Sequence, residues 1–514
     1  MIPNEISDEF DEKLTLFDED SKTNFVYCGP GKKRYLIALL CTIGLTVVIG
    51  MRSEMLGIIT NLKNSSDHSQ LIFKPSQHRK MPWKDPIMED FVENAVFFSY
   101  LVASPIGGFL TVKHDSSLLL GCSVAMTCGI NLFLPLVETL GNNLIPKITM
   151  IIFLRLLQGM AEGCLVPAVF GVLRFWCPKN EKSTILCLSV IGVSMGPLIG
   201  LPVCAEIEQK WGWGVVFYIY ANIGLIWCIF WWRIVDERPE NDRNLSKQER
   251  QYIFENSSFK SSFSKKSSAS IPWKLIFSSK PVYAIFCTYA ADDWTFQISS
   301  VCMQTYYLQM YKVRVEKTIY LLSFPFLARS IFVPIGGFLA DFLKLKTTWS
   351  WTTIRKCLAG LGFGLKGIFF IALSFAKDEM SATILLSLAL GFSGLAVAGY
   401  AVNVIDLAPN YAGLVMGFAN SISTFTGILS TVIASFIVSK MSQGWKIALC
   451  MAAGIQLFSM QMYLLFASSE KQKWANPKEQ TVEMEDISPE LPLCHKIVID
   501  AKSDEDFINL VNVQ

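Results

Sequence analysis

The sequence predicts an all-α membrane protein with twelve transmembrane helices in two six-helix halves. Three observations lead to this fold class. First, 52% of the 514 residues are hydrophobic and only 17% are charged, whereas a soluble protein carries about 25% charged residues. Second, twelve apolar runs approach or exceed the length of about 20 residues that a bilayer-spanning helix needs. Third, one hexapeptide occurs in both halves of the chain, at equivalent places.

The apolar runs fall into two groups of six around one polar stretch. They lie at 35–60, 90–112, 117–138, 147–176, 183–205 and 214–233, and then at 281–309, 318–342, 353–376, 381–405, 411–439 and 446–467. The predicted organisation is a disordered acidic tail (1–34), an N-terminal half (35–233), a central loop (234–280), a C-terminal half (281–467) and a second tail (468–514).

Basic residues predict which side of the membrane each loop faces. Lys32, Lys33 and Arg34 precede the first span, and the central loop is rich in Lys and Arg. Because basic loops stay in the cytoplasm, both tails and the central loop are expected there, although the first luminal loop is also basic. The sequon at Asn64 is then luminal and predicts glycosylation.

The repeated hexapeptide is PIGGFL, at Pro105–Leu110 near the end of the second span and at Pro334–Leu339 near the end of the eighth. Glycine pairs let membrane helices approach closely, but six matching residues indicate a duplicated half. The second copy continues with Asp341 and Lys344, and the turn resembles the signature loop of the major facilitator superfamily. Gly336, Gly337 and Asp341 are therefore expected to form a conformational loop.

Composition also excludes several classes of function. Lys and Arg exceed Asp and Glu by 45 to 43, a net charge of +2, so no basic footprint for nucleic acid is expected. None of the 14 cysteines forms a CxxC pair, which argues against metal and redox sites. No nucleophile–base or phosphate-loop pattern indicates an enzyme.

Ionisable residues inside the spans are the candidates for function, because each costs about 2.5–3.5 kcal/mol at the bilayer centre. Arg155, Gln158 and Glu162 follow i, i+3, i+7 spacing, so they share one face of the fourth span. This face is expected to meet a cavity or other helices. The alternative is an internal Arg155–Glu162 ion pair, but two helical turns, about 10.5 Å, separate them, so partners on other helices are favoured.

Asp292 and Asp293 stand side by side in the seventh span. Two adjacent carboxylates repel each other when both are charged, so the pair predicts a proton or cation site. The alternative is a helix break near mid-membrane, with Asp293 capping the second piece. For Arg329, Lys366 and Asp406 the structural interpretation is favoured over transport: snorkelling or local pairing for the two cations, and a helix end for Asp406.

Several motifs together resemble the major facilitator branch that contains vesicular glutamate transporters, sialin and sodium–phosphate cotransporters. The resemblance covers about 35–475, and PVYAI and ADFL resemble the vesicular glutamate transporters most. The motifs are FLRLLQGMAEG (153–163), PVYAI (281–285), WTF (294–296), VPIGG (333–337), ADFL (340–343), DLAP (406–409) and YAG (411–413).

The resemblance implies roles for individual residues. Arg52 matches an arginine that meets the substrate carboxylate, and Arg155 and Tyr100 are expected at the same substrate site. Glu162 matches an acid of that family and is expected in coupling or gating. Gln158, Glu93, Asp292 and Asp293 are predicted in coupling or gating from their own positions in the spans. The central cavity is expected to be lined by Arg52, Glu93, Arg155, Glu162 and Asp292.

This sequence departs from the glutamate carriers at four positions. Asp292 stands where they have an arginine, Glu93 and Val404 where they have histidines, and Val166 where they have a tyrosine. Exchanging an arginine for an acid changes the local charge by two units, in the direction that disfavours an anion.

The leading prediction is a monomeric secondary carrier of organic anions, most of all L-glutamate, in a synaptic or cytoplasmic vesicle membrane or the plasma membrane. Alternating access of the two halves would be driven by membrane potential or a proton gradient, with no cofactor beyond a coupling proton, sodium or chloride ion. One alternative is a sodium-dependent phosphate, sialic-acid-like or cationic cargo. The other is a non-transporting receptor or trafficking protein on a carrier fold.

Overall fold

A computed structural model describes residues 32–72, 86–139, 144–256 and 271–475. The N-terminal half is a bundle whose helices correspond in order to the six predicted runs, with two runs divided into consecutive helices. The helices are α2 (Lys33–Ile72), α3 (Pro86–Lys113), α4 (Ser116–Phe133), α5 (Leu144–Gly163), α6 (Leu165–Trp176), α7 (Lys182–Val190), α8 (Gly192–Trp211) and α9 (Trp213–Ile234), with the short η1 (Pro135–Thr139) after α4.

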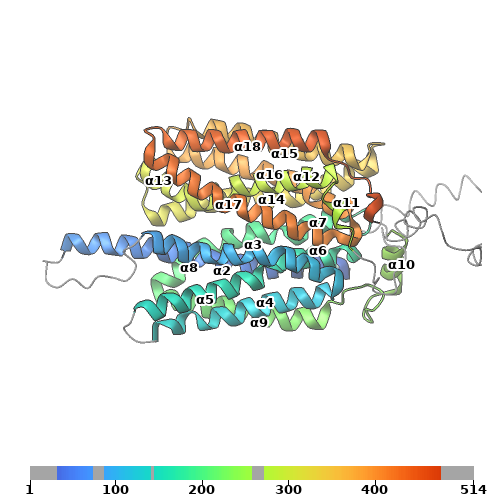
Figure 1. Cartoon of the computed structure of the whole chain (residues 1–514), viewed down its shortest axis with the longest axis horizontal. Coiled ribbons are helices and arrows are strands. Elements are labelled where there is room, and N and C mark those ends of the chain that lie inside the picture. Colours follow the sequence, from blue (N-terminus) through green and yellow to red (C-terminus); the bar gives the residue numbers. More distant parts are fainter. Residues whose placement is uncertain (1–31, 73–85, 140–143, 257–270, 476–514) are drawn as a thin grey trace, which may run out of the picture.

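The C-terminal half forms a second bundle of the same plan (Figure 1). Its first span is α12 (Lys280–Gln297), the single π-helical turn η2 (Ile298–Cys302) and α13 (Met303–Tyr311). The other spans are α14 (Val315–Lys346), α15 (Trp351–Leu373), α16 (Glu379–Leu407), α17 (Ala412–Lys440) and α18 (Gly444–Phe466), with η3 (Pro409–Tyr411) before α17 and η4 (Lys473–Ala475) after α18.

The fold-class prediction of an all-α membrane protein is confirmed. In the described part, eleven helical segments are long and apolar enough to cross a membrane. The span outside that set is the seventh, where α12 contains Lys280, Asp292 and Asp293 within 18 residues. Large apolar side chains such as Phe436, 65% exposed, and Val432, 59% exposed, cover the outside of the bundle, as expected for a surface that meets lipid.

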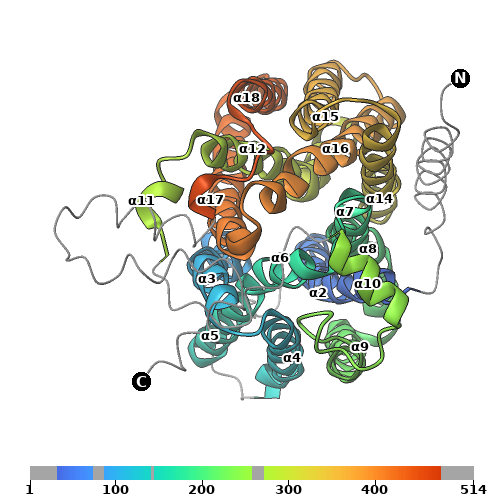
Figure 2. The ribbon, with the colours of Figure 1, turned by 90° about the vertical axis from the view of Figure 1, so that its right-hand side faces the viewer.

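The central loop contains two helices that its composition did not predict, α10 (Lys247–Glu255) and α11 (Trp273–Ile276). Both lie at one end of the bundle (Figures 1 and 2). α10 lies beside the first residues of α2, and α11 lies beside α3 and α17, where Trp273 packs on Phe109 and Phe418. We call this end of the bundle the α10 end. In the predicted topology it faces the cytoplasm, and that topology stays a prediction.

The two halves meet along their long axes, as the view along the bundle shows (Figure 2). α3 packs against α17, and α7 and α8 pack against α14. Each half is therefore a separate bundle, and the surface between the halves is where a passage through the molecule would lie.

Candidate functional site: a charged cavity between the halves

A cavity of about 180 Å³ lies between the two halves. Helices of both halves supply its wall, so a movement of one half against the other changes its shape. Its polar and charged lining residues are Arg52, Tyr100, Ser194, Tyr289, Asp292, Asp293, Gln297, Arg329, Tyr400, Asn420, Ser423 and Thr424.

In the N-terminal half, Arg52 of α2 faces this cavity. Its Nε and one terminal nitrogen, Nη2, both donate to Oε2 of Glu162, at 3.0 and 2.6 Å. The guanidinium stacks on the rings of Phe97 and Tyr100, with its central carbon 5.2 and 4.9 Å from their centroids. Glu162 is fully buried, whereas the Arg52 side chain remains 23% exposed. The third nitrogen, Nη1, takes part in none of these hydrogen bonds and is available to a ligand.

The polar stripe of the fourth span lies behind Arg52. Arg155 Nη1 donates to Gln158 Oε1 at 3.0 Å, and Gln158 Nε2 donates to Glu162 Oε1 at 2.7 Å. Gln158 thus joins the two charges that are too far apart for direct contact. Glu162 has its ion-pair partner on another helix, as the spacing suggested.

Arg155 and Glu162 do not line the cavity, so that expectation is wrong. The stripe points into the N-terminal bundle, where α5 packs on α3 and α4 and Arg155 lies 5.9 Å from the ring centroid of Phe217 on α9. The spacing correctly placed three polar groups on one face. It could not tell whether that face meets the passage or a neighbouring helix of the same half.

In the C-terminal half, Asp292 is surrounded by cations. Arg329 of α14 donates to its Oδ2 at 3.0 Å, and Lys366 of α15 donates to its Oδ1 at 2.6 Å. The hydroxyl of Tyr400 also donates to Oδ2, at 2.9 Å. Lys366 is fully buried, so it does not snorkel to the membrane surface. Local pairing, the structural interpretation predicted for Arg329 and Lys366, is confirmed, and the acid that they pair with is Asp292.

Asp293 has different surroundings from Asp292. It lines the cavity, and among the described residues no ion pair involves it. Gly427 of α17 leaves room for its carboxylate, because a Cβ at that glycine would lie 2.5 Å from Asp293 Oδ2. The alternative of a helix break at Asp293 is wrong, since α12 continues to Gln297 and the irregular π turn follows at Ile298–Cys302.

The charges near the cavity nearly balance. Four cations (Arg52, Arg155, Arg329, Lys366) and three acids (Glu162, Asp292, Asp293) lie in it or directly behind it. The sequence marks Arg329 and Lys366 as isolated charges inside apolar runs. It does not show that both lie against Asp292, because the three residues are on different helices.

Tyr100 lies at the boundary between the halves. Its hydroxyl accepts a hydrogen bond from Asn420 Nδ2 of α17 at 2.6 Å, and the same amide nitrogen donates to Ser104 Oγ at 3.0 Å. Tyr100 therefore contacts both the cavity arginine of its own half and a helix of the other half.

A second group of charges joins the halves at the α10 end. Asp341 of α14 accepts hydrogen bonds from the backbone N–H groups of Ser183 and Thr184, at 3.2 and 2.8 Å, in the first turn of α7. A carboxylate is favourable there because the N-terminus of a helix carries partial positive charge. Asp406 of α16 pairs with Lys182 at 2.8 Å and with Arg355 at 3.0 Å. Asp406 is thus a bridge between the halves as well as a residue near a helix end.

Both copies of the repeated hexapeptide bring glycine backbone to close contacts. A Cβ at Gly107 would lie 2.7 Å from Cys164 of its own half, and one at Gly336 would lie 2.9 Å from Leu395 of its own half. The second glycine of each pair faces the other half: a Cβ at Gly108 would lie 2.8 Å from Gly413 O, and one at Gly337 would lie 2.7 Å from Ser183 O. The repeat is therefore a repeat of contacts as well as of sequence.

Two predicted residues have side chains outside the described part. Glu93 lies within α3 and Asn64 within α2, which continues as a helix to Ile72, beyond the predicted end of the first span. Their predicted roles in coupling and glycosylation stay predictions.

Comparisons with known proteins agree with this architecture. The family model of the Major Facilitator Superfamily matches residues 91–431. The chain is 30% identical over 455 residues to vesicular glutamate transporter 2 of Homo sapiens, covering 88% of this chain and 77% of that protein. It is 31% identical over 459 residues to vesicular glutamate transporter 3 of Danio rerio, covering 88% and 76%. Vesicular glutamate transporter 1 of Bos taurus is 30% identical over 459 residues, covering 88% and 80%.

Proposed function

The chain belongs to the major facilitator superfamily, as a multi-pass membrane protein related to the vesicular glutamate transporters, and we propose that it carries a small organic anion across a membrane by alternating access. L-Glutamate, taken up into a vesicle, is the first cargo to test. Major facilitator carriers place substrate between their halves near mid-membrane, and the charged cavity, which is lined by residues of both halves, supports the same use here.

Arg52 is the observation that carries the proposal. A guanidinium stays charged and binds carboxylate in a two-pronged geometry. Glu162 and two aromatic rings hold the guanidinium of Arg52 in place, and its Nη1 remains available in the cavity. A substrate carboxylate would compete with Glu162 for this arginine. Gln158 would pass the change to Arg155, which gives the buried stripe a role in coupling without contact with substrate.

The acid at position 292 does not argue against an anion once its partners are considered. Arg329 and Lys366 both pair with it, so the cluster has one positive charge in excess. Two of its members, Arg329 and Asp292 itself, line the cavity. A dicarboxylate that reached from Arg52 to Arg329 would meet one cation from each half.

Asp293 is the proposed coupling carboxyl. Intramembrane acids that face a cavity commonly relay protons in transporters, and this one has room beside Gly427. The titratable and charged groups that share its cavity are Tyr289, Asp292, Arg52, Tyr100, Arg329 and Tyr400. Of these, Arg52 and Arg329 attract negative charge on Asp293, and an entering anion that paired with them would weaken this attraction and favour protonation of the carboxylate.

Uptake by purified protein in proteoliposomes tests the cargo and the role of Arg52. Glutamate is offered under an imposed membrane potential, which supplies about 2.3 kcal/mol per charge per 100 mV. Arg52→Gln is expected to lower uptake at least about 30-fold, the effect of truncating one member of a buried charge pair. Arg52→Lys should retain part of it, and Arg243→Gln in the exposed linker should retain all of it.

Unchanged glutamate uptake by Arg52→Gln would contradict the assigned role. The double variant Arg52→Gln/Glu162→Gln guards against misfolding, because it leaves no buried acid unpaired. It should remain folded and inactive.

Ion substitution tests the coupling. Asp293→Asn should abolish the dependence of uptake on a pH gradient while uptake driven by membrane potential persists. If uptake by this variant still depends on sodium or chloride, the coupling ion binds at a residue other than Asp293.

A second candidate cargo is suggested by Asp293 itself, since an acid without an ion-pair partner also suits a sodium ion or a cationic substrate. Phosphate with sodium, sialic acid and organic cations therefore belong in the same uptake panel. A protein that binds and moves none of them, under any gradient, would be a receptor on a carrier fold.

A further inference from the structure

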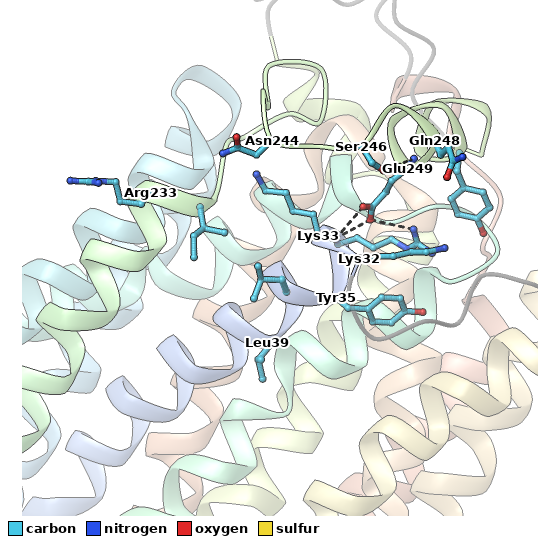
Figure 3. Close-up of a pocket in the computed structure, with 13 residues that line it drawn as sticks. Lys32, Lys33, Tyr35, Leu39, Arg233, Asn244, Ser246, Gln248 and Glu249 are labelled. Carbon is cyan, nitrogen blue, oxygen red and sulfur yellow. Dashed lines mark hydrogen bonds and ion pairs between the residues drawn. The ribbon is translucent and has the colours of Figure 1, made fainter.

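A second and larger cavity, of about 670 Å³, lies at the α10 end (Figure 3). It shares no lining residue with the cavity between the halves. It lies among the first residues of α2, the end of α9, and α10 with the residues before it. Nothing in the proposed transport cycle uses it. Its lining residues are Lys32, Lys33, Arg34, Tyr35, Leu36, Leu39, Arg233, Ile234, Asn244, Ser246, Gln248, Glu249 and Tyr252.

The wall of this cavity is basic, and hydrogen bonds between α10 and α2 fix its position. Four of the lining residues are Lys or Arg, and only Glu249 is acidic. Glu249 of α10 accepts hydrogen bonds from the backbone N–H groups of Lys33 and Arg34, at 3.2 and 3.3 Å. It thereby supplies a carboxylate to the N-terminus of α2, where negative charge is favourable.

Ion pairs fix the inner cations of the wall. The fully buried Arg34 donates to both oxygens of Glu181, at 2.8 and 3.0 Å, and Lys33 pairs with Asp242. At the rim, Arg233 is exposed, and among the described residues no ion pair involves it. The inner cations are thus fixed. The exposed side chain of Arg233 points away from the other labelled residues in Figure 3, and it can turn to meet a ligand.

The other side of the cavity is apolar and continues into the lipid-facing surface. Leu36 and Leu39 line it and are 40% and 55% exposed, and Trp232, next to Arg233, is 48% exposed. Exposed Trp beside basic residues is typical of the level where hydrocarbon gives way to water. The neutral polar side chains of Asn244, Ser246 and Gln248 border the opposite, water-facing side (Figure 3).

This combination suits one class of ligand. Basic pockets at the cytoplasmic ends of transmembrane helices bind phosphorylated lipid headgroups. In this cavity Lys32 and Arg233 would meet the phosphate, amide and hydroxyl groups would meet the headgroup hydroxyls, and Leu36 and Leu39 would meet the first carbons of the acyl chains. We propose that this cavity binds an anionic phospholipid whose headgroup carries phosphate monoesters.

Native mass spectrometry of the full-length protein tests the proposal. The protein is released from phosphatidylcholine nanodiscs with or without phosphatidylinositol bisphosphate, and retained lipid is counted. We expect one anionic lipid on the wild type. Affinity should fall about fivefold for each cation removed in Lys32→Gln/Arg233→Gln, since one Lys or Arg near the surface contributes about that factor.

The matched control is Lys280→Gln, which removes an exposed cation at the start of α12 in the other half. It should retain the lipid as the wild type does. Equal retention by all three proteins would overturn the site. If the double variant unfolds in phosphatidylcholine alone, the single variant Arg233→Gln at the exposed rim takes its place.

A separate arm distinguishes the lipid from a soluble phosphate compound. Inositol trisphosphate is added to protein in phosphatidylcholine nanodiscs, and binding is measured by calorimetry. Much weaker binding than that of the lipid supports the role of Leu36 and Leu39. Equal affinity would overturn the lipid assignment in favour of a soluble ligand.

Discussion

The two copies of the PIGGFL hexapeptide make the same glycine contacts but continue differently. In each copy the first glycine packs within its own half and the second packs on the other half. After the second copy, Asp341 accepts hydrogen bonds from the first turn of α7. After the first copy the equivalent residue is Val112, and Arg174 instead donates to the backbone oxygens of Asn410 and Thr111, at 2.9 and 3.2 Å.

The two copies therefore share a steric contact, the close glycine packing, but only the second is followed by an electrostatic contact, that of Asp341 with the first turn of α7. Close glycine packing depends only on backbone shape, so both copies retain it. A carboxylate at a helix N-terminus is a charged bond that can break and form again. The two halves are therefore symmetric in how they touch and asymmetric in how they are held together.

The cavity shows the same asymmetry. In the N-terminal half a cation, Arg52, faces the passage with its acid buried behind it. In the C-terminal half the first helix presents acids, and the buried Lys366 lies behind Asp292. Substitutions in each half can break these contrasts.

Removing Lys366 should be the most damaging change. Lys366→Met leaves Asp292 with one cation in the bundle interior, and loss of one partner of a buried ion pair costs about 3–5 kcal/mol. Thermal unfolding of the purified variant and wild type measures this loss of stability. Adding Asp292→Asn to this variant should restore part of the stability, whereas Lys377→Met at an exposed position should change little. No rescue by the second substitution would mean that the lysine acts through packing alone.

Alanine at the second glycine of each copy should weaken the contact between the halves equally. Gly108→Ala and Gly337→Ala each place a methyl group under 3 Å from a backbone oxygen of the other half, and overpacking costs about 1–3 kcal/mol. Gly129→Ala is the control, because nothing lies within 4 Å of its Cβ. Unfolding temperatures of the three variants decide whether the repeat is symmetric in energy as well as in geometry.

Asp341→Asn should act on conformation more than on stability. A charge at a helix N-terminus contributes about 0.3–2 kcal/mol, enough to shift the population of open and closed α10 ends several-fold. Distances between spin labels on α7 and α14, measured by electron paramagnetic resonance, should lengthen or broaden. A distribution identical to that of the wild type would show that Lys182, Arg355 and Asp406 hold this end by themselves.

The smallest effect is expected at Asp378, which caps the helix that directly follows it. Its carboxylate accepts a hydrogen bond from the backbone N–H of Ser381 at 2.9 Å, and this bond lowers the pKa of the carboxyl. A lowered folded-state pKa stabilises the protein above the pKa of the unfolded chain, and the benefit is lost as pH falls through the lower value. The difference in unfolding temperature between wild type and Asp378→Ala should therefore be small at neutral pH and shrink in acid, without any change in the α7–α14 distance.

The fold could be predicted from the sequence almost helix by helix, because in lipid the backbone must satisfy its hydrogen bonds within each span. The seventh span is the one whose local structure differs from the prediction. Its adjacent acids suggested a break at Asp293, whereas the irregular π turn begins at Ile298. The helices α10 and α11 were missed because the central loop is polar and its helices form against other parts of the protein.

The site was predicted less completely. Arg52 and Asp292 reach the cavity as expected, and Tyr100 and Asp293 line it beside them. Arg155 and Glu162 turn into their own bundle. Helical periodicity places residues on a common face, but it carries no information about which neighbour that face meets.

By itself the sequence determined that the protein lies in a lipid bilayer, how many spans it has and that its two halves are duplicated. Each of these depends on composition and on the local order of residues along the chain. Only the tertiary structure decided how the charges pair. Asp292 meets Arg329 and Lys366 across 37 and 74 residues of chain, and Arg52 meets Glu162 across 110. An aspartate looks the same in the sequence whether or not cations surround it in the folded protein. Electrostatic energy depends on the distances between charged groups, and for groups far apart in the chain only packing sets these distances.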